Sequence, residues 1–133
     1  MKLKSAESLL VVIKIHRMNM GMQSRTLAAL AGVSAKFMSQ LENNKTTVET
    51  DTLTKVSQVL GLKMPYLDNP EVLAQAIRQK RKALNLDQSV LASLCNVSPK
   101  FLSALENAHP KKRLNKVFDV LNGLGLTVEV VEP

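Results

Sequence analysis

Two short segments of the sequence each place a serine and a lysine where they could bind an anion. Ser34 and Lys36 lie in the first segment, and Ser98 and Lys100 lie at the matching places 64 residues further along. A lysine ammonium can donate to a phosphate oxygen or to guanine O6 and N7, and the sequence leaves both possibilities open. A serine just before a helix can also accept from the free N–H groups of the first turn. These residue types favour a binding site for an anionic partner, present twice.

The residues that usually carry catalysis are not grouped in the sequence. His16 and His109 are not matched by a histidine in the other half, and no carboxylate pair or His/Cys cluster has metal-ligand spacing. Cys95 stands where the first half has Ala31, which is typical of a small core residue. We therefore expect neither an enzyme nor a bound cofactor or metal.

The charge balance also favours an anionic partner. The chain has 18 basic and 11 acidic residues and a formal net charge of +7. Nucleic acid is the first partner that such a balance suggests, although a basic domain can simply have a soluble surface. One cysteine excludes an internal disulfide framework, and no stretch approaches the roughly 18 apolar residues of a membrane span. We expect a cytoplasmic, nucleoid-associated protein without a membrane partner.

The two segments belong to one unit written twice. VSAKFMSQLEN at 33–43 and VSPKFLSALEN at 97–107 differ at only three positions, and the same register holds without a gap from Leu9/Leu73 to Leu62/Leu126. Internal repetition decides the architecture before any local assignment. The sequence therefore predicts a first domain at 1–64, a linker at 65–70 and a second domain at 71–133.

Apolar residues at three- and four-residue spacing predict about four helices in each unit. The expected helices of the first unit cover residues 5–20, 24–31, 35–43 and 50–60. The expected second unit starts at about Glu71, with later helices at 88–95, from Pro99, and at 115–124. Glycine and asparagine exchange between the units at Gly21/Asn85 and Gly32/Asn96, and both tolerate a left-handed corner. Two short helices joined by such a corner are a helix-turn-helix.

The segments LAALAGVSAKFMSQLEN and LASLCNVSPKFLSALEN resemble the helix-turn-helix of the lambdoid phage repressor/Cro (XRE-type) superfamily. The resemblance extends over nearly the whole chain in two copies. It implies an all-α fold of two tandem lambda-repressor-like units. It also implies a sequence-specific transcriptional regulator, with a repressor as the expected kind, that binds double-stranded DNA. The third helix of each unit would then enter the major groove.

The resemblance also implies which side chains contact DNA. Gln88 stands where the superfamily places a glutamine that contacts phosphate or base, whereas the first unit has Ser24 there, followed by Arg25. A basic surface without a DNA role remains the alternative for the lysines. The predicted contact residues are Ser24, Arg25, Ser34, Ala35, Lys36, Ser39, Gln40, Lys45, Gln88, Ser89, Ser98, Pro99, Lys100, Ser103, Lys111 and Lys112, with Arg113 beside them.

Two arginine–glutamate pairs recur at the same separation in both units. Arg17 and Glu42 are 25 residues apart, and so are Arg81 and Glu106. In the superfamily, an arginine at this position pairs with the glutamate that ends the third helix. We interpret both pairs as structural ties between the first and third helices.

After the last helix, apolar and polar residues alternate in a pattern that predicts a strand. The predicted strand consists of Leu126, Thr127, Val128, Glu129, Val130 and Val131. No other segment of the chain looks like a strand, so we expect it to pair with its copy in a homodimer. This tail, together with the segments RKALNLDQ and FLSALENAHPKKRLNKVFDVLNGLGL, makes the second unit resemble HipB-type antitoxin–repressors. The resemblance implies a HipA-like toxin kinase as a possible partner. Besides a homodimer and a complex with a toxin, the sequence allows a third arrangement, in which the two units pack against each other as an internal pseudo-dimer and the chain stays monomeric.

Overall fold

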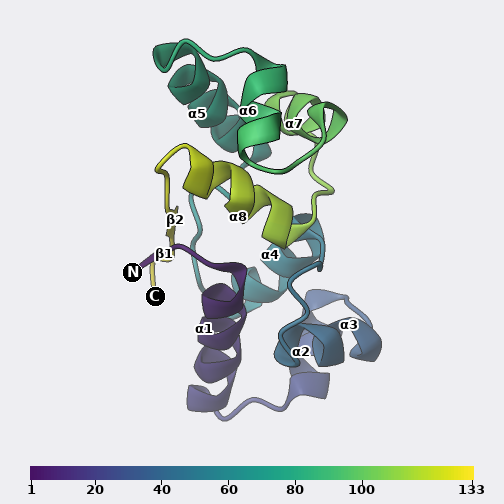
Figure 1. Cartoon of the computed structure of the whole chain (residues 1–133). Coiled ribbons are helices and arrows are strands. Elements are labelled where there is room, and N and C mark those ends of the chain that lie inside the picture. The colour runs from purple at the N-terminus through teal and green to yellow at the C-terminus, as the bar shows by residue number, and fades with distance from the viewer.

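The computed structural model describes all residues from Met1 to Pro133 and contains eight helices and two very short strands (Figure 1). The first unit consists of β1 (Lys2–Leu3), α1 (Ala6–Asn19), α2 (Ser24–Ala31), α3 (Ala35–Glu42) and α4 (Thr50–Val59). The second unit consists of α5 (Pro70–Ala83), α6 (Gln88–Leu94), α7 (Pro99–Glu106), α8 (Leu114–Gly123) and β2 (Val128–Glu129). The predicted fold class, all-α with two tandem four-helix units, is confirmed. None of these helices has the length and apolar character needed to cross a membrane.

The chain turns between helices where the paired glycine and asparagine residues predict a left-handed conformation. Gly21 and Gly32 have φ angles of 69° and 70°, and Asn85 and Asn96 have 60° and 58°. Glycine adopts this conformation without steric cost, and asparagine is among the few other residues that tolerate it. The predicted corners are therefore confirmed in both units.

The apolar faces of all eight helices meet in one continuous core of 31 buried residues. Helices α4 and α8 lie in the middle of the molecule, between α1–α3 on one side and α5–α7 on the other (Figure 1). Val56 of α4 and Val117 of α8 are fully buried. The predicted linker contributes Leu67, which is also buried. The two units therefore pack as one body around a shared core.

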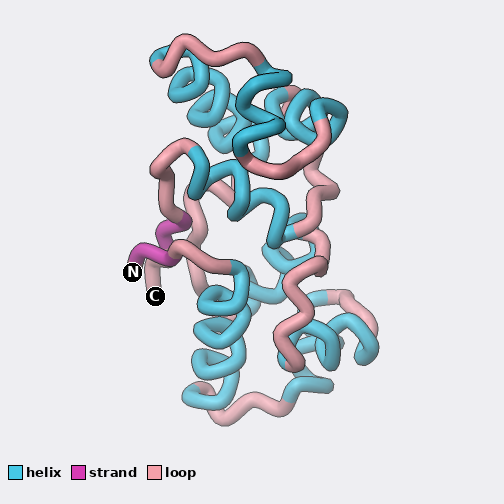
Figure 2. The backbone as a smooth tube through the Cα atoms, in the orientation of Figure 1, coloured by secondary structure: helices cyan, strands magenta, loops and turns pink.

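The C-terminal strand departs from the sequence prediction. The sequence offers residues 126–131 no partner within the chain, but β2 pairs antiparallel with β1, close to both chain ends (Figure 2). Val130 N also donates to Met1 O at 2.8 Å, and Val131 and Lys63 exchange backbone hydrogen bonds of 2.7 and 2.9 Å. The prediction that this strand needs a second molecule is wrong, because Met1–Leu3 and Lys63 satisfy its backbone groups.

The loops that follow α3 and α7 join the two units directly. Thr50 N donates to Lys112 O at 2.8 Å, and Leu114 N donates to Val48 O at 2.9 Å. The Thr50 hydroxyl adds a hydrogen bond to Pro110 O at 3.1 Å. These contacts fix the loop of one unit against the loop of the other.

Candidate nucleic-acid interface

Each third helix begins with a serine cap two residues after the left-handed corner. The Ser34 hydroxyl accepts a hydrogen bond from Phe37 N at 3.0 Å, and the Ser98 hydroxyl accepts one from Phe101 N at the same distance. In the second unit Pro99 follows the cap, which suits the first helical position because its missing N–H would be unpaired anyway. The sequence thus sets the start of α3 and of α7 in the same way.

Ion pairs hold the third helix of each unit against the first. Arg81 donates from Nε and Nη2 to the two carboxylate oxygens of Glu106, both at 2.9 Å, and from Nη1 to Leu86 O at 2.9 Å. Arg17 makes the matching contacts to Glu42 and to Met22 O. The side chains of Arg17 and Arg81 are only 14% and 12% exposed, so both ion pairs are partly buried and position the third helix against the first.

The predicted contact residues at the helix starts are all exposed to solvent. They are the caps Ser34 and Ser98, Ala35 and Lys36 on α3, and Pro99 and Lys100 on α7. Further along these helices, Ser39 is exposed, whereas Gln40 and Ser103 are half-buried. The Asn43 side chain donates to the Ser39 hydroxyl at 3.3 Å, so part of the hydrogen-bonding capacity of Ser39 is used within the helix. The first turn is therefore the most accessible part of each third helix.

The remaining predicted residues lie at the starts of α2 and α6 and in the loops after the third helices. Ser24 and Gln88 are the half-buried first residues of α2 and α6, and each is followed by an exposed residue, Arg25 or Ser89. The Arg25 guanidinium donates to the Gln23 side chain at 2.8 Å. In the loops, Lys45 and Lys111 are exposed and Lys112 is half-buried.

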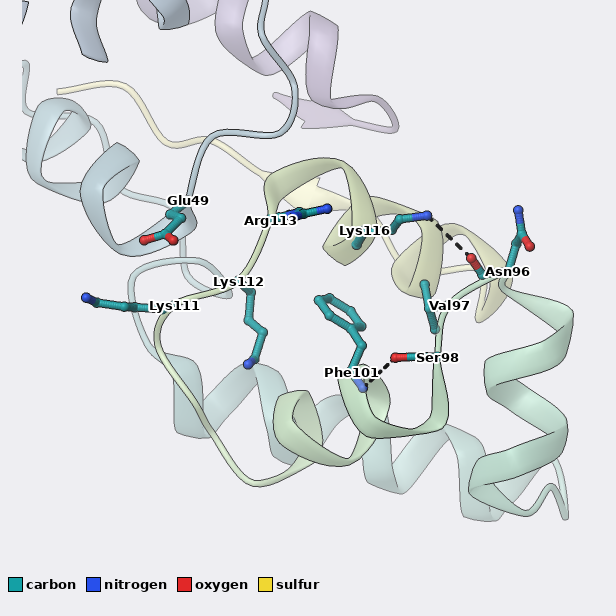
Figure 3. A pocket seen from close by; sticks show the side chains of 9 residues that line it. All are labelled: Glu49, Asn96, Val97, Ser98, Phe101, Lys111, Lys112, Arg113 and Lys116. Carbon is teal, nitrogen blue, oxygen red and sulfur yellow. Dashed lines mark hydrogen bonds between the residues drawn. The ribbon is translucent and has the colours of Figure 1, made fainter. Parts of the chain in front are cut away.

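A hollow of about 420 Å³ opens between α7 and the loop that precedes α8 (Figure 3). The Lys112 ammonium lies 5.8 Å from the centre of the Phe101 ring, within the range of a cation–π contact. Burial lowers the pKa of Lys112. Lys111 extends away from Phe101 in Figure 3, toward solvent. The hollow is lined by Glu49, Asn96, Val97, Ser98, Phe101, Lys111, Lys112, Arg113 and Lys116.

A second hollow, of about 450 Å³, occupies the corresponding place in the first unit. Phe37 lines it where Phe101 lines the first, and Glu49 and Arg113 line both hollows. The two hollows are therefore neighbours on the molecule. The second is lined by Phe37, Gln40, Lys45, Thr47, Val48, Glu49, Thr52 and Arg113.

The structure brings together only some of the predicted residues. Ser98, Lys111 and Lys112 line the hollow beside α7, whereas Gln40 and Lys45 line the one beside α3. The other predicted contact residues line neither hollow. They lie on the outer surface of the helix-turn-helix rather than in a cavity.

Sequence reasoning missed two charged residues of this surface, Glu49 and Lys116. The Lys116 ammonium donates to Asn96 O at 3.5 Å, in the turn that precedes α7, and lies 4.0 Å from Asp119 Oδ2 on its own helix. The signal is present in the repeat, because Lys116 replaces Thr52 of the first unit. A comparison of charges between matched positions would have found it.

The two helix pairs, each with a left-handed corner, a capped third helix and a tie to the first helix, define a tandem helix-turn-helix protein. The model of the Helix-turn-helix family (HTH_3) matches residues 13–67 and again residues 77–131. The chain belongs to this family, with two copies of its domain. It is also similar to the uncharacterized HTH-type transcriptional regulator y4mF of Sinorhizobium fredii (strain NBRC 101917 / NGR234), with 31% identity over 67 residues. That alignment covers 50% of this chain and 88% of the relative. No solved structure matches the chain significantly.

Proposed function

We propose that the chain binds specific sequences of double-stranded DNA and acts as a transcriptional repressor. The observation that carries this proposal is the exposed first turn of α3 and of α7, each with a capping serine and a lysine. In a helix-turn-helix, the N-terminal residues of the second helix of the motif contact base edges in the major groove. Family membership and the regulator name of the relative support the same function.

In this proposal the helix starts and the loops have different roles. Lys36 and Lys100 project from the first turns and would contact base edges or the nearest phosphates. Lys111 and Lys112 lie in the loop after α7 and would hold the DNA backbone. Phosphate contacts fix the register of the protein, and base contacts select the sequence.

Salt dependence of duplex binding tests the proposal. The full chain is titrated against a labelled duplex selected from a random library, at several salt concentrations. Each phosphate neutralised by a lysine or arginine contributes a slope of about −0.9 to log K against log salt. We expect a negative slope of several units and tighter binding to the selected duplex than to a scrambled one. A slope near zero would overturn the proposal.

The alternative function, a HipB-like antitoxin that neutralises a HipA-like kinase, is not favoured by the structure. Part of its motivation is a C-terminal strand available for dimerisation, and β2 pairs with β1 of the same chain. The antitoxin function therefore rests on the resemblance alone. Co-purification of a kinase with the full chain from its native host would be the result that revives it.

A further inference from the structure

The loops after α3 and α7 meet at residues that correspond in the two units. Glu49 pairs with Arg113 in an antiparallel bridge, and these residues are 64 apart, which is the repeat distance. At the repeat distance, Thr50 corresponds to Leu114 and Val48 corresponds to Lys112. If the two units are exchanged, the hydrogen bond from Thr50 N to Lys112 O therefore becomes the one from Leu114 N to Val48 O. A contact that maps onto itself in this way is isologous and has two-fold symmetry. An approximate two-fold axis therefore passes between Glu49 and Arg113.

The two candidate DNA-contacting helices flank this axis. Glu49 and Arg113 line both hollows, and each hollow is also lined by the matching phenylalanine of a third helix, Phe37 or Phe101. Helices α3 and α7 also lie on the side of the molecule opposite the two chain ends in Figure 1. In dimeric helix-turn-helix proteins, a two-fold axis relates two such helices that contact half-sites one helical turn apart. Here one chain contains both members of the pair.

The shared core fixes this arrangement. Leu53 and Val56 of α4 and Val117 and Val120 of α8 are fully buried in the same cluster. A continuous apolar interior prevents the two units from turning independently, unlike domains on a flexible linker. The spacing of α3 and α7 is therefore a built-in property of the chain.

The two sides of the axis differ in charge at matched positions. The second unit has Lys111, Lys112, Arg113 and Lys116 where the first has Thr47, Val48, Glu49 and Thr52. The hollow beside α7 is therefore lined by four basic residues and one acidic residue, and the one beside α3 by two basic residues and one acidic residue. More phosphate contacts are available on the side of α7.

We infer that a single chain binds an operator made of two unlike half-sites, with α7 and its basic loop on one half and α3 on the other. This inference rests on the proposed DNA-binding function. Unequal helices select unequal half-sites, because Gln40 and Ala35 of α3 are replaced by Ala104 and Pro99 in α7. The loop of the second unit anchors its half of the duplex by phosphate contacts. The complex therefore contains one chain per duplex and has a fixed orientation on the DNA.

The test uses the full chain and duplexes that it enriches from a random library. We expect enriched sequences with two different half-sites centred about one helical turn apart. Light scattering should give the mass of one chain on one duplex. Hydroxyl-radical footprinting should show two protected segments, with stronger protection of the half that contacts α7.

Exchange of matched residues tests the charge asymmetry. The double variant Lys111→Thr with Lys116→Thr gives the second unit the residues of the first. It should reduce the magnitude of the slope of log K against log salt by about 1–2. It should weaken protection only of the half-site that contacts α7. The reciprocal variant, Thr47→Lys with Thr52→Lys, should strengthen protection of the half-site that contacts α3 and increase the magnitude of the salt slope.

The outcomes separate the two proposals. No salt-dependent binding to any duplex would overturn the DNA-binding function itself. Salt-dependent binding with two chains per duplex, with a perfect palindrome, or with a single protected segment would overturn only the inference of a one-chain, two-half-site reader. Equal loss of protection on both halves in the lysine-to-threonine variant would also overturn it.

Discussion

Removal of the Glu106 carboxylate should destabilise the protein more than most single substitutions. Glu106 is 1% exposed and accepts two hydrogen bonds of 2.9 Å from Arg81. The hydrogen bond to Glu106 is also the main reason that the pKa of Arg81 is raised. Glu106→Ala leaves the guanidinium without its partner while its side chain is only 12% exposed. Breaking a buried pair by removing one member costs about 3–5 kcal/mol. We therefore expect Glu106→Ala to lower the free energy of unfolding by about 3–5 kcal/mol.

The assay is urea unfolding followed by far-UV circular dichroism, with two comparisons inside the chain. Glu42→Ala breaks the matched pair in the first unit, where both side chains are 14% exposed, and should cost less. Glu132→Ala removes an exposed carboxylate without an ion-pair partner and should change stability by about 0.5 kcal/mol or less.

A double variant separates loss of the pair from the burden of an unpaired charge. Arg81→Met with Glu106→Leu removes both charges and should cost less than Glu106→Ala alone, because no uncompensated charge stays buried. A cost of less than about 1 kcal/mol for Glu106→Ala, or a double variant as unstable as the single one, would refute the reasoning.

Three further predictions concern stability, and each is measured by urea unfolding. A Cβ at Gly123 would lie 2.4 Å from Cys95 Sγ, so Gly123→Ala should cost about 1–3 kcal/mol; Cys95→Ala in the same chain should restore most of it, and no rescue would contradict this explanation. Burial raises the pKa of Asp68 above its ordinary 3.8, despite a hydrogen bond from Met64 N. The stabilising contribution of Asp68 is therefore present below pH 3.8 and lost as pH rises through the folded pKa. The stability of Asp68→Asn relative to the wild type should thus increase as pH rises, and parallel pH profiles of the two proteins would exclude this role. Ser98→Ala removes the cap of α7 and should cost about 1 kcal/mol, and a neutral effect would show that the hydroxyl is dispensable.

Local sequence features predict the helices and the corners between them. The two copies act as an internal control, because a glycine in one unit and an asparagine in the other at the same position indicate a required left-handed conformation. The repeat shows that Arg17 and Glu42 have the same separation as Arg81 and Glu106, and the resemblance to the superfamily implies that each arginine pairs with its glutamate.

Two features depend on contacts that the sequence pattern does not contain. The partner of the C-terminal strand is a two-residue strand at Lys2–Leu3, too short to show any alternation. The bridge between Glu49 and Arg113 lies beside Val48 and Leu114, which are buried in the common core, and the pattern within each repeat does not show that the two loops meet there. The repeat predicts the residues of the candidate site for each unit separately, so it does not reveal the neighbouring hollows or the position of Lys116.

The most direct test of the account is the affinity of the double variant Lys36→Glu with Lys100→Glu for a duplex selected by the wild-type chain. The control, Lys2→Glu with Lys4→Glu, makes the same change in net charge on exposed residues near the chain ends, away from α3 and α7 (Figure 1). We predict that the first variant loses at least about tenfold in affinity while the control loses much less. Unchanged affinity in the first variant, or an equal loss in both, would contradict the claim that the starts of α3 and α7 contact the DNA.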